Sequence, residues 1–110
     1  MLLNQIFLEM IMTSKSFCAG REEALADIIE IAKRCKDLEE LIEALNESII
    51  DETIELKNTE RYQRPFKKGK VVEKRRMYCL AKKLLKEKVG IEEYRNLLSE
   101  RIAEFDVEDC

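Results

Sequence analysis

The residues best able to do chemistry in this sequence are lysines and arginines gathered in one stretch of the chain. Residues 61–88 hold 12 bases and 2 acids, a net charge of +10, although the whole chain has a formal net charge of −3. Lysine and arginine at this density can neutralise phosphates and release the counterions that surround nucleic acid. Tyr62 and Phe66 lie in the same stretch and could stack on exposed bases. The candidate contact residues are Arg61, Tyr62, Arg64, Phe66, Lys67, Lys68, Arg75, Arg76, Lys82, Lys83 and Lys86.

The same positive charge could instead serve the domain itself. Residues 1–60 carry a net charge of −8 and residues 89–110 of −5, so the basic segment could neutralise acidic helices of its own domain. It could also be solvated surface alone. The sequence pI is about 5.2, whereas dedicated nucleic-acid-binding domains are usually basic. We predict a small non-catalytic binding or adaptor module whose basic segment contacts nucleic acid or an acidic protein.

A second set of candidates consists of carboxylates. Glu40-x-x-Glu43 is followed by Glu55-x-x-Asn58, and carboxylates at i and i+3 on one helix face can share a Mg²⁺ ion. This pattern resembles the E-x-x-E … E-x-x-D motif of the all-α nucleotide pyrophosphohydrolases (the MazG-like family), with Asn58 where that family has aspartate. The resemblance implies a dimer that hydrolyses nucleoside triphosphates with Mg²⁺, held by Glu40, Glu43 and Glu55. It is the alternative to the binding module.

Several other chemistries are excluded by composition. The chain has no histidine, so Ser–His and Cys–His catalysis are excluded, and it has no glycine-rich phosphate loop. The four cysteines lack the close spacing of a structural zinc site. We therefore expect no catalytic residue, metal or cofactor in the binding module. The thiols of Cys18, Cys35, Cys79 and Cys110 should be free in an ordinary cytosol, whereas in a hyperthermophile they could pair in three ways.

Apolar residues at helical spacing predict the elements that position these side chains. We expect helices over residues 2–13, 21–35, 38–57, 70–89 and 91–105. Loops should lie over 14–20, a segment that ends in Gly20, and over 58–69. Asp37 begins a D-x-x-E sequence that resembles a capping box, and Gly90 should end the fourth helix as its C-terminal cap. The first helix carries the stripe Leu2, Leu3, Ile6, Phe7, Met10 and Ile11.

In the fourth helix, basic and apolar residues should occupy opposite faces. A wheel of about 100° per residue places Arg75, Arg76, Lys82, Lys83 and Lys86 within roughly one third of the circumference. Met77, Leu80, Ala81 and Leu84 fall opposite them. The basic face should therefore point to solvent while the apolar face packs into the core.

No single helix can bury its stripe alone, so we expect one all-α domain over residues 1–110, an antiparallel bundle of four to five helices. This domain includes a basic loop and helix over residues 61–88. It also includes an acidic C-terminal tail over residues 106–110. Ile50 and Ile54 lie off the core stripe, which suggests surplus apolar surface and a homodimer. The first residues lack the positively charged start of a secretory signal peptide. No stretch reaches the roughly 20 apolar residues that a membrane-spanning helix needs. We expect a cytoplasmic protein with no membrane partner. Its many Glu and Lys residues are typical of thermophiles.

Overall fold

The computed structural model describes the backbone of residues 2–110 and the side chains of residues 12–110. Its elements are α1 (Leu2–Arg34), α2 (Leu38–Lys57), a short 3-10 helix η1 (Arg61–Gln63), α3 (Arg64–Lys86) and α4 (Ile91–Glu104). This range contains no β-strand, so the predicted all-α fold class is confirmed. The apolar stripe expected on residues 2–11 concerns side chains that lie outside the described residues.

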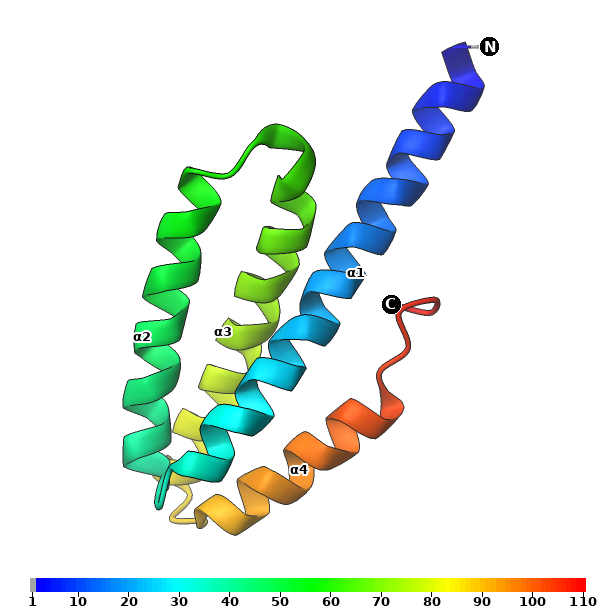
Figure 1. Ribbon diagram of the computed structural model, residues 1–110. Helices are drawn as coiled ribbons and strands as arrows, with labels where there is room; N and C mark the ends of the chain where they lie inside the picture. The colour runs from blue at the N-terminus through cyan, green and yellow to red at the C-terminus, as the bar shows by residue number, and fades with distance from the viewer. Residues whose placement is uncertain (1) are drawn as a thin grey trace.

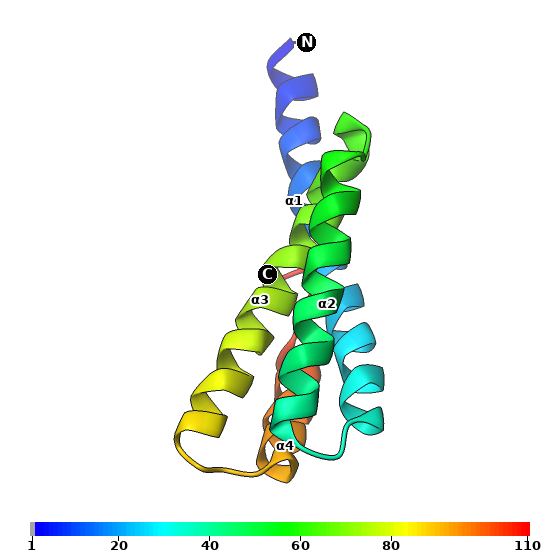
Figure 2. The ribbon, with the colours of Figure 1, turned by 90° about the vertical axis from the view of Figure 1, so that its left-hand side faces the viewer.

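The first three α-helices run up and down beside one another, with α3 packed against both α1 and α2 (Figure 1). The shorter α4 packs mainly against the C-terminal half of α1 (Figures 1 and 2). Their facing stripes form one core, whose largest fully buried apolar side chains are Tyr94, Leu25, Ile28, Leu41, Leu45 and Leu98. The molecule measures 56 × 29 × 21 Å, and the first turns of α1 extend beyond the turn between α2 and α3.

The loop predicted over residues 14–20 is wrong, because this segment lies inside the single long helix α1. The described chain consequently has four α-helices, and the fifth helix of the predicted range is not present in it. Gly20, the residue that suggested the loop, is instead a contact point between helices. A Cβ atom at Gly20 would lie 1.9 Å from the carbonyl oxygen of Phe66, and one at Gly69 would lie 2.0 Å from that of Phe17. The two glycines therefore let the backbones of α1 and α3 touch.

The helix over residues 38–57 is confirmed as α2, and so is its cap. The Asp37 carboxylate accepts a hydrogen bond of 2.8 Å from the backbone N–H of Glu40. This contact satisfies one of the amide groups that the start of a helix leaves unpaired. Cys35, just before the cap, is 5% exposed and part of the core.

Two boundaries around α3 differ from the predictions. The main loop ends at η1, and α3 already begins at Arg64 because Pro65 fits the first turn of a helix. At the other end, Gly90 is not the C-terminal cap: its φ is −85° and it precedes α4 as the N-cap. Lys88 takes the left-handed conformation, with φ of 61°. Val89 then donates a hydrogen bond of 2.9 Å to the carbonyl of Leu84 and closes the end of α3.

A disulfide between Cys18 and Cys110 attaches the acidic tail to α1, while Cys35 and Cys79 are free thiols. Only one pair is therefore bonded, so the structure matches neither four free thiols nor any full pairing of the four cysteines, and the tail that follows α4 is fixed at its last residue. No helix within the described residues is long and apolar enough to cross a membrane.

Candidate nucleic-acid interface

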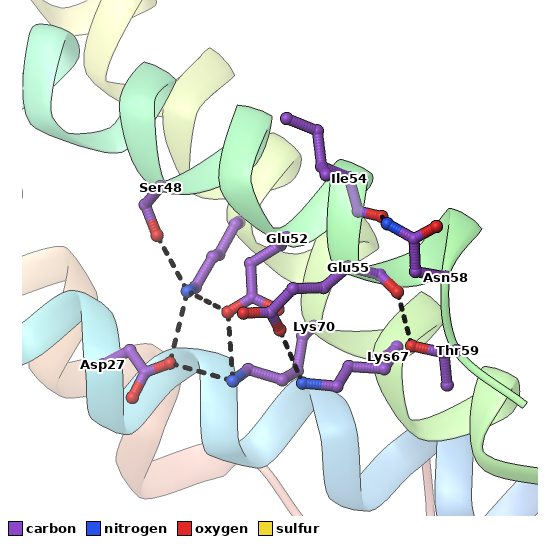
Figure 3. Close-up of polar contacts among 10 residues, drawn as sticks. Asp27, Ser48, Glu52, Ile54, Glu55, Asn58, Thr59, Lys67 and Lys70 are labelled. Carbon is purple, nitrogen blue, oxygen red and sulfur yellow. Dashed lines mark hydrogen bonds and ion pairs between the residues drawn. The ribbon is translucent and has the colours of Figure 1, made fainter.

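Ten of the 12 cations of residues 61–88 form two groups, an inner and an outer one, and only Arg76 and Lys88 belong to neither. The inner group faces α1 and α2 and includes the part-buried Lys70 and the buried Lys74, with side chains 13% and 3% exposed. Lys74 Nζ is 3.2 Å from a carboxylate oxygen of both Asp27 and Glu52. Lys70 Nζ lies 3.4 Å from the same oxygen of Asp27 and 3.1 Å from that of Glu52 (Figure 3). These two lysines are neutralised within the bundle.

Lys67 belongs to the inner group as well, although the sequence placed it in the contact surface. Its ammonium nitrogen donates a hydrogen bond of 2.7 Å to Glu55 Oε2, near the turn that joins α2 to α3 (Figure 3). This hydrogen bond and the charge of Lys67 hold the pKa of Glu55 below its ordinary value. Burial would lower the pKa of Lys70, but Glu52 and Asp27 outweigh burial and raise it. The inner cations are therefore neutralised by carboxylates of the domain itself.

The buried carboxylate of Glu73 holds a third group of charges together. It is fully buried, and it accepts hydrogen bonds of 3.0 Å from Arg21 Nε and 3.1 Å from Arg101 Nε. Burial would raise its pKa, but the hydrogen bonds from Arg101 and Arg21 outweigh burial and hold the pKa below its ordinary value. Arg76 is more loosely attached, at 3.9 Å and with a side chain 53% exposed. Helices α1, α3 and α4 are thus joined through one carboxylate.

The outer group forms what we call the basic stripe. All seven of its cations are exposed, and among the side chains of residues 12–110 no carboxylate forms an ion pair with any of them. From Arg64 onward they recur at steps of three, four or seven positions, with Lys83 beside Lys82, and so follow one side of α3. At 1.5 Å per residue, the part within α3 is about 33 Å long. The basic stripe consists of Arg61, Arg64, Lys68, Arg75, Lys82, Lys83 and Lys86.

The two faces predicted for this helix agree with the observed burial. Met77, Ala81 and Leu84 are buried, and the five cations expected opposite them are exposed. Two of the outer cations make local contacts with uncharged groups. Arg64 Nε donates to the backbone oxygen of Thr59 at 3.2 Å, and Lys82 Nζ lies 5.3 Å from the centre of the Tyr78 ring. The Thr59 carbonyl and the Tyr78 ring carry no formal charge, so neither contact forms an ion pair.

The two candidate aromatic residues are placed differently. Tyr62, in η1, is 73% exposed at the end of the basic stripe. Phe66 is half-buried in the first turns of α3, and its carbonyl oxygen faces Gly20. A base can therefore reach the Tyr62 ring readily, whereas part of Phe66 is covered by the bundle.

The carboxylates of the alternative function do not come together. Glu40 and Glu55 are both on α2, about 22 Å apart along the helix axis, and line the two ends of a groove between α1 and α2 of about 610 Å³. Glu43 is exposed and does not line it, and Glu55 already pairs with Lys67. No three metal-ligating side chains within the described residues are grouped so that they could hold an ion.

Sequence reasoning missed the part of α1 that borders the basic stripe. Thr13, Ser16 and Phe17 line grooves against η1 and the start of α3. Because residues 14–20 were predicted to form a loop, these residues were not assigned to any helix face. The signal that could have found them is the pair of small residues, Gly20 and Gly69, at which two helices can approach closely.

Comparison of the chain with protein-family models, curated proteins and solved structures finds no match. The charges and shapes of the chain itself are therefore the basis for assigning a function.

Proposed function

We propose that this protein is a non-catalytic helical module that binds nucleic acid by laying the basic stripe of α3 along the phosphate backbone. The observation that carries the proposal is the division of the cations. The bundle neutralises Lys67, Lys70 and Lys74 with its own carboxylates, but among the described residues it forms no ion pair with the seven cations of the outer face. Like charges three and four positions apart destabilise a helix by a few tenths of a kcal/mol per pair. An external polyanion would relieve that repulsion.

The dimensions of the stripe support a phosphate backbone as the partner. Six of the seven cations present a line of positive charge over about 33 Å of α3, and duplex DNA carries one negative charge per roughly 1.7 Å of its axis. Phosphate contacts of this kind position a protein on nucleic acid without reading its sequence. We therefore propose binding that depends weakly on base sequence and strongly on salt.

A salt titration of binding to a fluorescent oligonucleotide tests the proposal. If all seven cations contact phosphates, the slope of log K against log salt should approach about −6 for duplex DNA. Arg75→Glu combined with Lys82→Glu should abolish binding at moderate salt. The matched control, Lys33→Glu combined with Lys57→Glu, makes the same change in net charge on exposed residues of α1 and α2 and should leave most of the affinity.

Two results would overturn this function. Absence of binding at low salt would remove nucleic acid as the partner. Equal or tighter binding of a poly-glutamate peptide of similar charge would replace nucleic acid by an acidic protein.

We also propose that the module is a homodimer. Ile50 and Ile54 are 50% and 53% exposed, one turn apart on the outer face of α2, where they form an apolar pair without cover. Packing two such faces across a two-fold axis would bury them. Sedimentation analysis should give the mass of two chains, and Ile50→Lys with Ile54→Lys should give that of one. A single-chain mass for the unchanged protein would end this proposal.

The cytoplasmic location expected from the sequence stays a prediction. The disulfide between Cys18 and Cys110 bears on it, because such bridges persist in the cytoplasm of hyperthermophiles and are rare in that of mesophiles. The Glu- and Lys-rich composition is in keeping with the former.

A further inference from the structure

At the start of the basic stripe, α1 and α3 form a wedge whose walls combine three kinds of chemistry. Gly20 and Gly69 hold the two backbones in contact, and α1 continues past this crossing beyond the start of α3 (Figure 1). Two adjoining hollows of about 810 and 350 Å³ lie in the wedge and share Thr13, Arg61 and Pro65. We call them together the junction groove. Its further lining residues are Met12, Ser14, Ser16, Phe17, Tyr62, Arg64 and Lys68.

The apolar part of the junction groove is open to solvent. Met12 and Tyr62 are 67% and 73% exposed, and both line the larger hollow together with Pro65. An exposed thioether, an aromatic ring and a proline ring form a surface suited to the flat face of a base, since bases stack on aromatic side chains regardless of their identity. Thr13 and Ser16 line the same hollow, and side-chain hydroxyl groups can hydrogen-bond the polar edge of a base.

The charged residues that line the groove are all positive within the part of the chain whose side chains are described. Arg61, Arg64 and Lys68 line the smaller hollow, and among the described side chains none of them has a carboxylate partner. The first turn of α3 contains no acidic residue, and Gln63 before it makes no capping hydrogen bond with its side chain. The positive end of the α3 dipole therefore adds to these charges and favours an anion there.

We propose that the junction groove binds one unpaired nucleotide of a single strand, with its base on Tyr62 and Met12 and its phosphate between Arg61 and Arg64. This inference rests on the proposed function, and it adds a preference for single-stranded nucleic acid. In a duplex, the faces of the bases are covered by their neighbours and cannot reach Tyr62. An acidic peptide would satisfy the cations but would leave the exposed ring and thioether without a flat apolar partner. The larger hollow has the volume of ordinary small-ligand sites, which span about 300–1,000 Å³.

Binding of three probes of equal charge separates this proposal from simple phosphate contact. The probes are oligo(dT), an abasic strand of the same length and a duplex with the same number of phosphates. Oligo(dT) should bind at least about fivefold more tightly than the abasic strand, the lower limit expected for stacking of one base. Tyr62→Ala should remove this advantage and leave binding of the abasic strand unchanged within twofold.

Two further variants keep the test specific. Tyr62→Phe retains the ring and should keep the advantage of oligo(dT). Leu85→Ala removes another exposed apolar side chain, at the opposite end of α3 from the groove, and should change nothing. Because the chain has no tryptophan, tyrosine emission should be quenched on binding oligo(dT), and Tyr62→Phe should lose that quenching while it still binds.

The outcomes distinguish failure of the groove from failure of the function. If all three probes bind alike, and Tyr62→Ala binds them as the unchanged protein does, the junction groove does not hold a base, although the basic stripe still binds phosphates. If none of the probes binds at low salt, the proposed function and the groove fail together.

Discussion

The crossing of α1 and α3 at Gly20 and Gly69 makes a sharp prediction about stability. A methyl group added at Gly20 would lie 1.9 Å from the carbonyl oxygen of Phe66, whereas ordinary contacts begin at 3.4 Å. The atom in the way belongs to the backbone, so no side-chain rotation can make room. Gly20→Ala must therefore push the two helices apart by roughly 1.5 Å at this point.

The magnitude follows from two opposing effects. Alanine is favoured over glycine inside a helix by about 1 kcal/mol, which would stabilise the variant. Overpacking costs about 1–3 kcal/mol even where side chains can move, and here two backbones must separate. We expect a net loss of about 2 kcal/mol in the free energy of unfolding for Gly20→Ala, and a similar loss for Gly69→Ala. Because one separation accommodates both methyl groups, the double variant should lose less than the sum of the two single losses.

Urea unfolding followed by circular dichroism measures these changes. Gly90→Ala is the control, since no atom lies within 4 Å of the added methyl group and the φ of −85° suits alanine. It should lose less than about 1 kcal/mol, the usual effect of alanine at a helix N-cap. If Gly20→Ala and Gly69→Ala unfold at the same urea concentration as the unchanged protein, the close crossing is not a property of the folded chain.

Three further predictions concern the charges and ends of the bundle. Glu73→Gln should lower the free energy of unfolding by about 3 kcal/mol, because it removes the buried counterion of the part-buried Arg21 and Arg101 guanidinium groups. Folding lowers the pKa of Glu73, so the stability that its carboxylate contributes is present above the ordinary pKa of 4.5. That contribution is lost as the pH falls toward the lower pKa of the folded state. The Glu73→Gln variant should therefore lack this pH-dependent loss of stability in an acid titration of unfolding. Reducing the disulfide between Cys18 and Cys110, 92 residues apart, should lower the free energy of unfolding by about 4–5 kcal/mol, as thermal melts with and without reductant would show. Lys88→Gly should raise the free energy of unfolding, measured in urea, by roughly 0.5–1 kcal/mol, because glycine adopts the left-handed conformation without strain. An unchanged free energy of unfolding would show that Lys88 is not strained.

Local signals predicted some elements well. The boundaries of α2 followed from its apolar spacing and from Asp37, whose carboxylate caps the helix start through a contact three residues away. Such contacts depend on neighbours in the sequence alone, and no other part of the fold can displace them. The buried face of α3 was predictable for the same reason, because helical geometry fixes which of its residues share a side.

Glycine was the least reliable signal. Gly20 suggested a loop but lies within a helix, and Gly90 suggested a helix end but begins the next helix. A glycine permits a turn and also permits close approach of another backbone, and only the position of the second helix decides between them. The left-handed residue at the end of α3 is Lys88, which no propensity favours.

The sequence by itself determined that the chain folds into helices and that residues 61–88 concentrate its positive charge, because both depend on residue type and spacing along one chain. Only the tertiary structure decided which of those cations are available to a partner. Lys74 and Arg75 are adjacent and alike in charge, yet one is buried between two carboxylates and the other is exposed. Charge is a property of the residue, but neutralisation depends on which side chains of distant segments pack within a few ångströms of it.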